Sequence, residues 1–541
     1  MTLKTVAVIM IALIAVVLRV LYVERGNLIY DEYQHMHAAY LLSQGLTPFR
    51  DFFEHHTPLF YYLAATVIPM EEPSFDTLIQ ARYMSVSFHV LTVVVAGLWV
   101  RRLAGPVTGT VIVLLLASNV CFFVWGCRTY LDTYAAPLLI ISAWALPVRG
   151  PSPWRSLLSA LAMGTAILFT QKAVFAGLGP ALIFAVRACR EIGHPTRRGA
   201  YLGDLGAFIL GALMTAITLP ILLGVDGFEA FIRDAVVLNL NWKARHGPLP
   251  ELREMASTDL FVYLMALAGL VTSIRDIARC RFSVEELQLP ALYLLGLCLG
   301  VLLLPVVWEE YFVLILPFAV IVAGLQIIKL WKWCFRSKAI SDTPPKPLHL
   351  CRKGIVVLFA GTSMINLLIV TSSGGRLEIL MRLGIPILWI IGGAVIWKAR
   401  QRFYGWDRIA WLLLILVFPI TQQARWVRRH SNEGDRQRIE YVLATTSPSD
   451  PIFDGRSGYL VFRPNAYWYW FLHDEMQLML SEQQKGPDII RVLEEKKVPI
   501  VIVDGFTKML PAEVLEYIRR YYEDTPFDEI KRRVARNGNH R

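Results

Sequence analysis

Long apolar runs constrain this chain more than any other feature of its sequence. Residues 5–23, 84–100 and 354–371 carry few or no charges, and each run approaches the roughly 20 residues that a helix needs to cross a bilayer. Charged residues make up 18% of the 541 positions, against about 25% in a typical soluble domain. The sequence therefore predicts a polytopic membrane protein. It excludes a disordered chain, a secreted disulfide scaffold and an ordinary cytosolic enzyme.

Thirteen apolar segments are candidates for membrane-spanning helices. They lie at 5–23, 79–100, 106–125, 133–147, 156–171, 173–187, 205–223, 259–274, 290–307, 311–330, 354–371, 379–397 and 409–421. A further apolar stretch, 57–70, is about fourteen residues long, which favours a re-entrant or interfacial helix over a span. We therefore expect an all-α polytopic membrane domain of about 13 transmembrane helices over residues 1–421.

Basic residues indicate the orientation of this domain. When the N-terminus is placed in the cytoplasm and 57–70 is not counted as a span, Lys and Arg gather in the inward loops. The same bias accounts for the net charge of +11, because segment 421–541 holds 19 Lys or Arg against 18 Asp or Glu. We predict a multi-pass protein of the plasma (inner) membrane with a cytoplasmic N-terminus, an extracytoplasmic C-terminus and no nucleic-acid partner.

Three outward segments are long enough to carry structure of their own. They are 24–78, 224–258 and the C-terminal segment 422–541. The first is expected to hold an amphipathic helix at 31–44, before the short helix at 57–70. The last is expected to form a small extracytoplasmic α/β domain, with helices at 435–446, 487–497 and 509–522 and a buried strand at 500–503.

The densest polar cluster lies in the first outer segment. It contains Asp31 and Glu32, followed by Glu54, His55 and His56. Two adjacent acids at the water–lipid boundary can supply a general base or oxygen ligands. The alternative is a capping Asp beside a solvated Glu. A metal site assembled from His55, His56 and the neighbouring Glu54 together with Asp31 is a further interpretation, and an ordinary polar loop is its alternative.

Other charged residues gather at the same outer face. Asp132 follows the third span, and an i,i+4 pair with Arg128 is the structural alternative to a catalytic role. Lys172 lies between two apolar stretches and Arg82 opens the second span, where snorkelling to head groups explains each one singly. Together they suit a lipid-linked phosphate whose head group is attacked by a base-activated nucleophile. The turn at 309–311 is either a simple turn or a further wall of this cavity.

These motifs resemble a known superfamily. An Asp-Glu pair beyond the first span, followed by DFFEHHTPLFYYL at 51–63, is similar to the first outer loop of GT-C glycosyltransferases. The resemblance is closer to the protein O-mannosyltransferase and aminoarabinose-transferase family, which depends on polyprenyl-phosphate sugars. It extends over roughly residues 5–330, through Arg82, the RRLAG turn at 101–105, Asp132, Lys172 in its FTQK context and 311–324.

The resemblance implies an integral-membrane glycosyltransferase. Such an enzyme moves a sugar from a polyprenyl-phosphate donor to a hydroxyl of a glycan, lipid or protein acceptor on the outer face of the membrane, with inversion. Asp31 would activate the acceptor hydroxyl, Glu32 would support it or contact the sugar, and Asp132 would be the second acid. The donor phosphate would be held by Lys172, Arg82 and Arg128, and the acceptor side or site wall would comprise Glu54, His55 and His56.

The resemblance leaves the use of a metal open. Some family members bind a divalent metal near the first outer loop. The family often has Glu-Lys-Pro-Pro or His-Pro-Pro at this point, whereas this chain has Glu-His-His-Thr-Pro at 54–58. A divalent metal ion is therefore a candidate cofactor, and the resemblance implies no other.

Three other classes of protein are alternatives to a transferase. A polytopic secondary transporter typically shows inverted repeats and midplane charges, whereas most of the acids here gather at one face. A lipid-linked polymer ligase or polymerase needs a long outward catalytic loop, for which 224–258 is the candidate. A non-catalytic scaffold would use the C-terminal domain for binding, and substitution of Asp31 or Asp132 would then have no effect.

Overall fold

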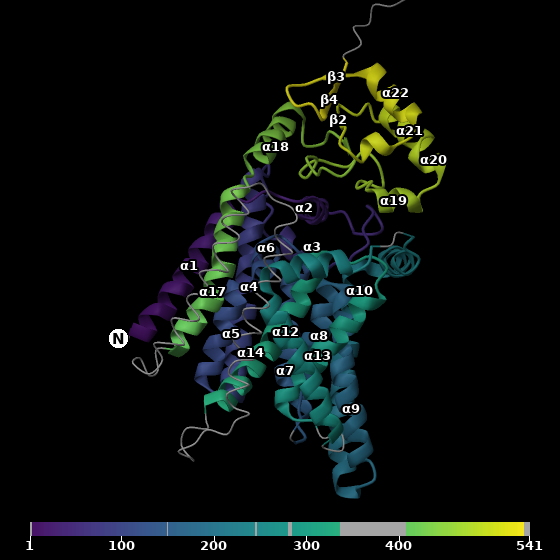
Figure 1. Cartoon of the computed structure of the whole chain (residues 1–541). Coiled ribbons are helices and arrows are strands. Elements are labelled where there is room, and N and C mark those ends of the chain that lie inside the picture. The colour runs from purple at the N-terminus through teal and green to yellow at the C-terminus, as the bar shows by residue number, and fades with distance from the viewer. Residues whose placement is uncertain (1–2, 149, 244–245, 280–283, 336–406, 535–541) are drawn as a thin grey trace, which may run out of the picture.

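A bundle of long helices and a smaller C-terminal segment make up the fold. The computed structural model describes residues 3–148, 150–243, 246–279, 284–335 and 407–534. Figure 1 shows the C-terminal segment placed over one end of the bundle, with α2 (Tyr30–Ser43) lying between the two. The predicted spans at 354–371 and 379–397 lie outside the described residues.

Each predicted span within the described ranges coincides with helix in the bundle. The bundle elements are α1 (Leu3–Arg25), α4 (Phe75–Ala104), α5 (Pro106–Ser118), α6 (Val120–Gly126), α7 (Leu131–Ala145), α8 (Pro153–Phe169), η1 (Gln171–Gly177), α9 (Leu178–Glu191), α10 (Pro195–Phe231), η2 (Ile232–Val237), α11 (Leu238–Leu240), α12 (Leu249–Arg279), η3 (Glu286–Gln288), α13 (Leu289–Leu303), η4 (Glu309–Tyr311), α14 (Phe312–Phe335) and α17 (Asp407–Arg429). Among the described residues, six helical segments are long and apolar enough to cross a membrane, or seven if the bent pair α5 and α6 is one span. The chain is a multi-pass membrane protein, and the count of thirteen spans is not confirmed.

The bend between α5 and α6 is held by polar side chains from other helices. The two helices meet at Asn119 with an angle of 65°. Arg19 of α1 and Gln423 of α17 each donate to the Ala117 carbonyl at 3.0 Å. Asp259 of α12 accepts from the Asn119 side-chain amide at 2.9 Å. A break inside a bilayer is tolerated when partners of this kind satisfy the freed backbone groups.

Removing one of these partners should weaken the bundle. Gln423 is fully buried and also donates to the Asn119 carbonyl, so Gln423→Met should lower the free energy of unfolding by about 1–3 kcal/mol. Gln422→Met is the matched control, because the Gln422 side chain is half-buried and makes no hydrogen bond within the described part of the chain. Unfolding of both variants in detergent, followed by intrinsic fluorescence, measures the difference. Equal stability of the two variants would contradict this role for Gln423.

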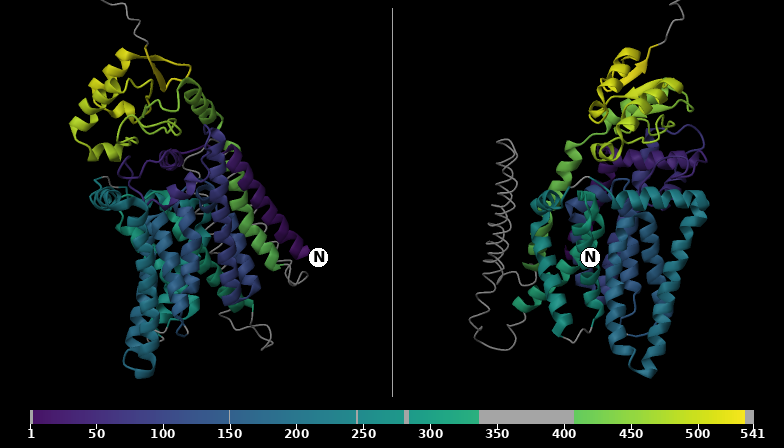
Figure 2. Two further views of the ribbon diagram at one scale, coloured as in Figure 1. Left: turned by 180° about the vertical axis from the view of Figure 1, so that it is seen from behind. Right: turned by 90° about the vertical axis from the view of Figure 1, so that its right-hand side faces the viewer.

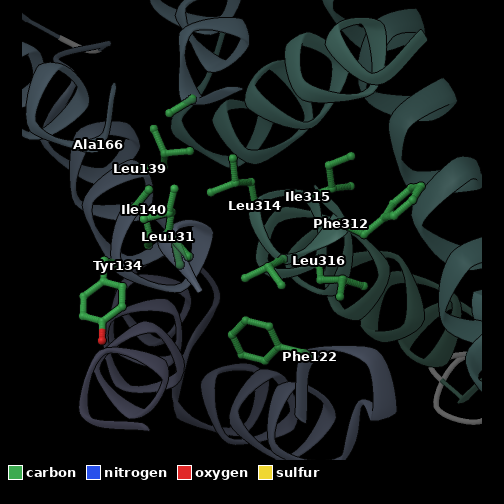
Figure 3. Close-up of a cluster of buried hydrophobic side chains, with 14 of the residues drawn as sticks. Phe122, Leu131, Tyr134, Leu139, Ile140, Ala166, Phe312, Leu314, Ile315 and Leu316 are labelled. Carbon is green, nitrogen blue, oxygen red and sulfur yellow. The ribbon is translucent and has the colours of Figure 1, made fainter. Parts of the chain in front are cut away.

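The core of the bundle is apolar and closely packed. Figure 3 shows side chains of α7, α8 and α14 meeting around Leu139, Ile140 and Leu314, all of them buried. At Gly164, α8 and α10 approach so closely that an added Cβ would overlap Thr215. Because lipid tails are as apolar as these side chains, close packing of this kind is what holds membrane helices together.

The C-terminal segment carries the one sheet found among the described residues. Its strand order is β1-β2-β4-β3, with β1 parallel to β2 and the other two pairs antiparallel. The predicted helices and the predicted strand at 500–503 coincide with elements of this segment, and the predicted domain boundary at 421/422 falls inside α17. The elements are α18 (Glu433–Thr445), β1 (Ile452–Asp454), α19 (Asp474–Met479), α20 (Glu482–Lys485), α21 (Pro487–Glu495), β2 (Ile500–Ile502), η6 (Thr507–Met509), α22 (Ala512–Tyr521), β3 (Tyr522–Asp524) and β4 (Ile530–Arg533).

The helix predicted at 31–44 is present as α2, but it is not amphipathic in its surroundings. All residues from Glu32 to Leu41 are buried. The cause is the C-terminal segment, which covers the face of α2 that would otherwise meet water. His37 Nδ1 of α2, for example, lies 3.1 Å from the Val461 carbonyl. The apolar stretch at 57–70 forms only the seven-residue helix α3 (Leu59–Ala65), as expected for a segment that does not span the membrane.

Further contacts attach the C-terminal segment to the first outer segment. Trp470 Nε1 donates to the Phe53 carbonyl at 2.9 Å. Arg463, fully buried, pairs with Glu72 at 2.6 Å. Figure 2 shows the C-terminal segment over the same end of the bundle from two further directions. The first outer segment is therefore enclosed between two parts of the chain.

Candidate functional site

A cavity of about 380 Å³ lies where the bundle, the first outer segment and the C-terminal segment meet. Its lining is formed by Ile29, Tyr30, Asp31, Gln34, His55, His56, Trp125, Tyr130, Gln171, Lys172, Asn239, Trp242, Leu304, Pro305, Val306, Trp308, Glu310, Tyr311, Arg456, His473 and Glu475. Four of the residues predicted for the site are among them, namely Asp31, His55, His56 and Lys172. The other five are not part of the lining, namely Glu32, Glu54, Arg82, Arg128 and Asp132.

Asp31 presents an ionised carboxylate to this cavity. It lies in the first turn of α2, after an N-cap at Ile29, so it does not cap the helix. Its side chain is 23% exposed, and its Oδ1 lies 3.4 Å from Arg456 Nη2. Burial opposes ionisation, but nearby positive charge, Arg456 first, outweighs burial and holds the pKa of this carboxyl below its usual value. Asp31 is therefore negatively charged at neutral pH.

The histidines beside Asp31 are neutral at the same pH. Burial, followed by the neighbouring His56, lowers the pKa of His35 to about 3. Burial, followed by Lys172, lowers the pKa of His56 to about 3. Because both imidazoles are uncharged near pH 7, each offers a nitrogen lone pair that can accept a hydrogen bond or bind a metal ion.

Glu32 and Arg82 form a buried ion pair behind the cavity. Arg82 Nη2 lies 2.6 Å from one oxygen of Glu32, and its Nε lies 2.7 Å from the other. The remaining guanidinium hydrogen bonds go to the carbonyls of Val23, Gly26 and Asn27, at 3.4, 2.7 and 2.6 Å. Both side chains have an exposed fraction of 1% or less. Burial opposes ionisation of Glu32, but Arg82 outweighs it and lowers the pKa of Glu32. The pair ties α2 to α4.

Asp132 pairs with Lys172 at 2.7 Å, which corrects the i,i+4 pair with Arg128 that was the alternative. The ammonium of Lys172 also lies 3.7 Å from the centre of the Tyr311 ring. Arg128 instead lies over Trp125, with 4.7 Å from its guanidinium carbon to the ring centre. The ion pair thus brings one predicted acid and one predicted cation together at the wall of the cavity.

Glu54, His55 and His56 are a group that could hold a divalent metal ion. One ligand atom from each lies within 4.8 Å of the others. Glu54 is fully buried, and its Oε1 lies 2.9 Å from His56 Nδ1, while its Oε2 has no hydrogen-bond partner in the described part of the chain. A carboxylate oxygen beside imidazoles is a donor set that suits Zn²⁺. A second such group comprises His473, Asp474 and Glu475.

Two features of the lining were not assigned from the sequence. Arg456 lies 425 positions away from Asp31 in the chain, within a DGRSG loop whose two glycines around an arginine are the one local signal that could have identified it. Glu310 belongs to the turn at 309–311 and accepts a hydrogen bond of 3.0 Å from the Tyr130 hydroxyl. That turn is therefore a wall of the cavity, the second of its two interpretations.

Comparison with solved structures identifies a known fold. The crystal structure of ArnT from Cupriavidus metallidurans bound to undecaprenyl phosphate is 13% identical, with a TM-score of 0.63 over 98% of this chain and 99% of that chain. This chain has the ArnT fold. The apo state of the same ArnT gives a TM-score of 0.62 at 13% identity, over 98% of each chain. The apo oligosaccharyltransferase of Archaeoglobus fulgidus gives a TM-score of 0.49 at 11% identity, over 99% of this chain and 75% of that chain.

The match to ArnT confirms the predicted resemblance at the level of the fold. The resemblance drawn from motifs covered roughly residues 5–330, whereas the structural match covers nearly the whole chain. No family model matches the sequence, and no curated protein matches it either.

Proposed function

We propose that this chain is an integral-membrane glycosyltransferase that moves a sugar from a polyprenyl-phosphate donor to an acceptor hydroxyl, with inversion. The observation that carries the proposal is the cavity, which Asp31, Lys172 and Arg456 line together in a chain with the ArnT fold. A carboxylate can accept the acceptor proton, and Lys and Arg side chains bind phosphate. The ArnT crystal structure that this chain resembles holds undecaprenyl phosphate.

The proposed reaction is a single displacement. The acceptor oxygen attacks the anomeric carbon of the donor sugar while its proton passes to the Asp31 carboxylate. The bond between the anomeric carbon and the phosphate oxygen breaks, and the phosphate leaves with the bonding electrons. The new glycosidic bond forms on the opposite face of that carbon, which inverts its configuration. Lys172 stabilises the negative charge that the leaving phosphate gains.

In this proposal Glu32 and Arg82 are positioning residues, although the resemblance implied a donor-phosphate role for Arg82. The hydrogen bonds of Arg82 go to Glu32 and to backbone carbonyls, and neither side chain lines the cavity. Asp132 likewise positions Lys172, because it is fully buried and pairs with the ammonium. Arg128 also lies outside the lining, so Lys172 remains the predicted cation that can reach a phosphate directly.

If a divalent metal takes part, Glu54, His55 and His56 would hold it. Such an ion supplies positive charge that stabilises a leaving phosphate. His55 and His56 line the cavity, whereas Glu54 anchors them from behind through its hydrogen bonds to the His55 amide and the His56 ring.

The proposal includes an orientation. The cavity and the C-terminal segment face the outside of the plasma (inner) membrane, and the N-terminus faces the cytoplasm. Figure 1 supports this arrangement, because α1 starts at the end of the bundle that is opposite to the C-terminal segment. The donor would reach the cavity from the bilayer, and a glycan, lipid or protein acceptor would reach it from the outer aqueous side.

Lipid-resolved mass spectrometry of membranes tests the proposed function. Cells that lack the protein should accumulate one polyprenyl-phosphate sugar, and one glycan should lose a single sugar in parallel. Wild-type protein should restore both, whereas Asp31→Asn should restore neither. If neither lipid nor glycan changes while a solute is redistributed across the membrane, the transporter is the better account. Accumulation of a lipid-linked polymer would instead favour the ligase.

A further inference from the structure

The C-terminal segment contributes a cation to the cavity. Lys172 and Arg456 are the two Lys or Arg side chains in the described lining. Lys172 already has a close carboxylate partner in Asp132, at 2.7 Å. Arg456 reaches Asp31 through one nitrogen at 3.4 Å, which is a long contact for an ion pair. Arg456 is therefore the cation of the cavity that is held less tightly.

The loop that carries Arg456 is held in place by hydrogen bonds and by close packing. Asp504 accepts a hydrogen bond from the Arg456 backbone amide at 2.8 Å. Asp454, which is buried, accepts from the Gly458 amide at 3.0 Å. Gly458 has a φ of +85°, and an added Cβ there would overlap Tyr33 of α2. The loop is thus fitted against the same helix that carries Asp31.

Two aromatic rings hold the guanidinium of Arg456. Its central carbon lies 5.1 Å from the centre of the Tyr30 ring and 5.3 Å from that of Phe506. Contacts between a guanidinium and ring faces leave its N–H edge available for an anion. In the present structure Asp31 occupies that edge, through one nitrogen only.

The contact between Arg456 and Asp31 is suited to exchange. Both side chains are 23% exposed, so the contact contributes little stability. A phosphate offers arginine two oxygens in a geometry that the guanidinium matches with two short hydrogen bonds. The need for a cation also grows during the reaction, because a phosphodiester with one negative charge becomes a phosphomonoester with about two.

We propose that Arg456 exchanges its partner Asp31 for the donor phosphate when the donor binds, so that donor binding releases the base. This inference rests on the proposed function. The exchange also improves the base, because loss of the nearby cation raises the pKa of Asp31 toward neutral pH. An acceptor that arrives before the donor meets a carboxylate that is still paired. The C-terminal segment thereby regulates the site and is part of it.

Binding of undecaprenyl phosphate to the purified protein, measured by titration in native mass spectrometry, tests this inference. Arg456→Met should weaken binding about 10- to 100-fold, because a charge-assisted hydrogen-bonding partner of the phosphate is lost. Arg456→Lys should bind with intermediate affinity, because lysine keeps the positive charge but lacks the two parallel N–H groups of the guanidinium. Arg491→Met is the matched control, since Arg491 is 59% exposed on α21 and does not line the cavity. It should bind like the wild type.

The pH dependence of kcat/KM gives a second readout that a merely structural role would not move. In Arg456→Met the acidic limb should shift to higher pH, because Asp31 loses the cation that lowers its pKa and binds its proton more readily. The inference would be overturned if Arg456→Met bound undecaprenyl phosphate as tightly as Arg491→Met does. It would also be overturned if the acidic limb did not shift. Either result would leave the proposed function standing. Wild-type protein that does not bind this lipid would overturn the proposed function as well.

Discussion

Asp31→Asn should lower kcat about 10²- to 10⁴-fold, the usual contribution of a positioned general base. Asparagine has nearly the same shape as aspartate but cannot accept the acceptor proton at neutral pH. The fold should be preserved, because the side chain is 23% exposed and its salt bridge to Arg456 is 3.4 Å long. Transfer rates at saturating donor and the melting temperature, measured on the same preparation, separate these two effects.

Asp76→Asn is the control for that experiment. Asp76 lies in the first turn of α4, its side chain is 67% exposed, and it pairs with Arg436 at 3.0 Å outside the cavity. The same chemical change should therefore leave kcat within about twofold of the wild-type value, since an exposed ion pair contributes little. If Asp31→Asn turned over as fast as Asp76→Asn, Asp31 would not be the base. The other carboxylates of the lining, Glu310 and Glu475, would then be the candidates.

Arg82→Met should destabilise the protein by about 3–5 kcal/mol, because it leaves the Glu32 carboxylate buried without its partner. The Gly26 and Asn27 carbonyls lose their donor at the same time. Glu32 should respond by taking up a proton, since its pKa rises once the cation that lowers it is gone. Denaturant unfolding in detergent micelles measures the loss of stability.

Two variants make this prediction specific to the ion pair. Arg102→Met changes an exposed arginine at the other end of α4 and should leave stability nearly unchanged. The double variant Glu32→Gln with Arg82→Met should lose less than the sum of the two single changes, because neither charge is then left unpaired. An Arg82→Met protein as stable as Arg102→Met would show that the fold does not depend on this pair.

Much of the fold could be predicted because its signals are local. An apolar run such as 79–100 specifies a membrane helix by its own composition, and α4 covers it. The short apolar run at 500–503 predicted a buried strand, and it coincides with β2. The prediction that the helix at 31–44 has an exposed polar face was wrong. Burial of α2 depends on a segment more than 400 positions away, as the contact between His37 and Val461 shows.

The site could be predicted only in part, for the same reason. Asp31 was assigned because it belongs to the polar cluster beyond the first span, and Lys172 because it lies between two apolar stretches. The structure brings both side chains to one cavity. The partner of Asp132 could not be identified from sequence spacing. Arg128 is four positions from Asp132, as in an i,i+4 pair, whereas the observed partner Lys172 belongs to η1, 40 positions further along the chain. Arg456 lies in a loop without periodicity, and only the folded chain places it beside Asp31.

Reconstitution of the reaction tests the central claim most directly. Purified protein would be placed in liposomes that contain the polyprenyl-phosphate sugar accumulated by cells lacking the protein, together with the glycan that had lost its sugar. Mass spectrometry would follow the free polyprenyl phosphate and the glycosylated acceptor. The account predicts that wild-type protein forms both in equal molar amounts and that Asp31→Asn forms both about 10²- to 10⁴-fold more slowly. An unchanged donor with wild-type protein, or a solute moved into the liposomes without any glycosylated product, would contradict it.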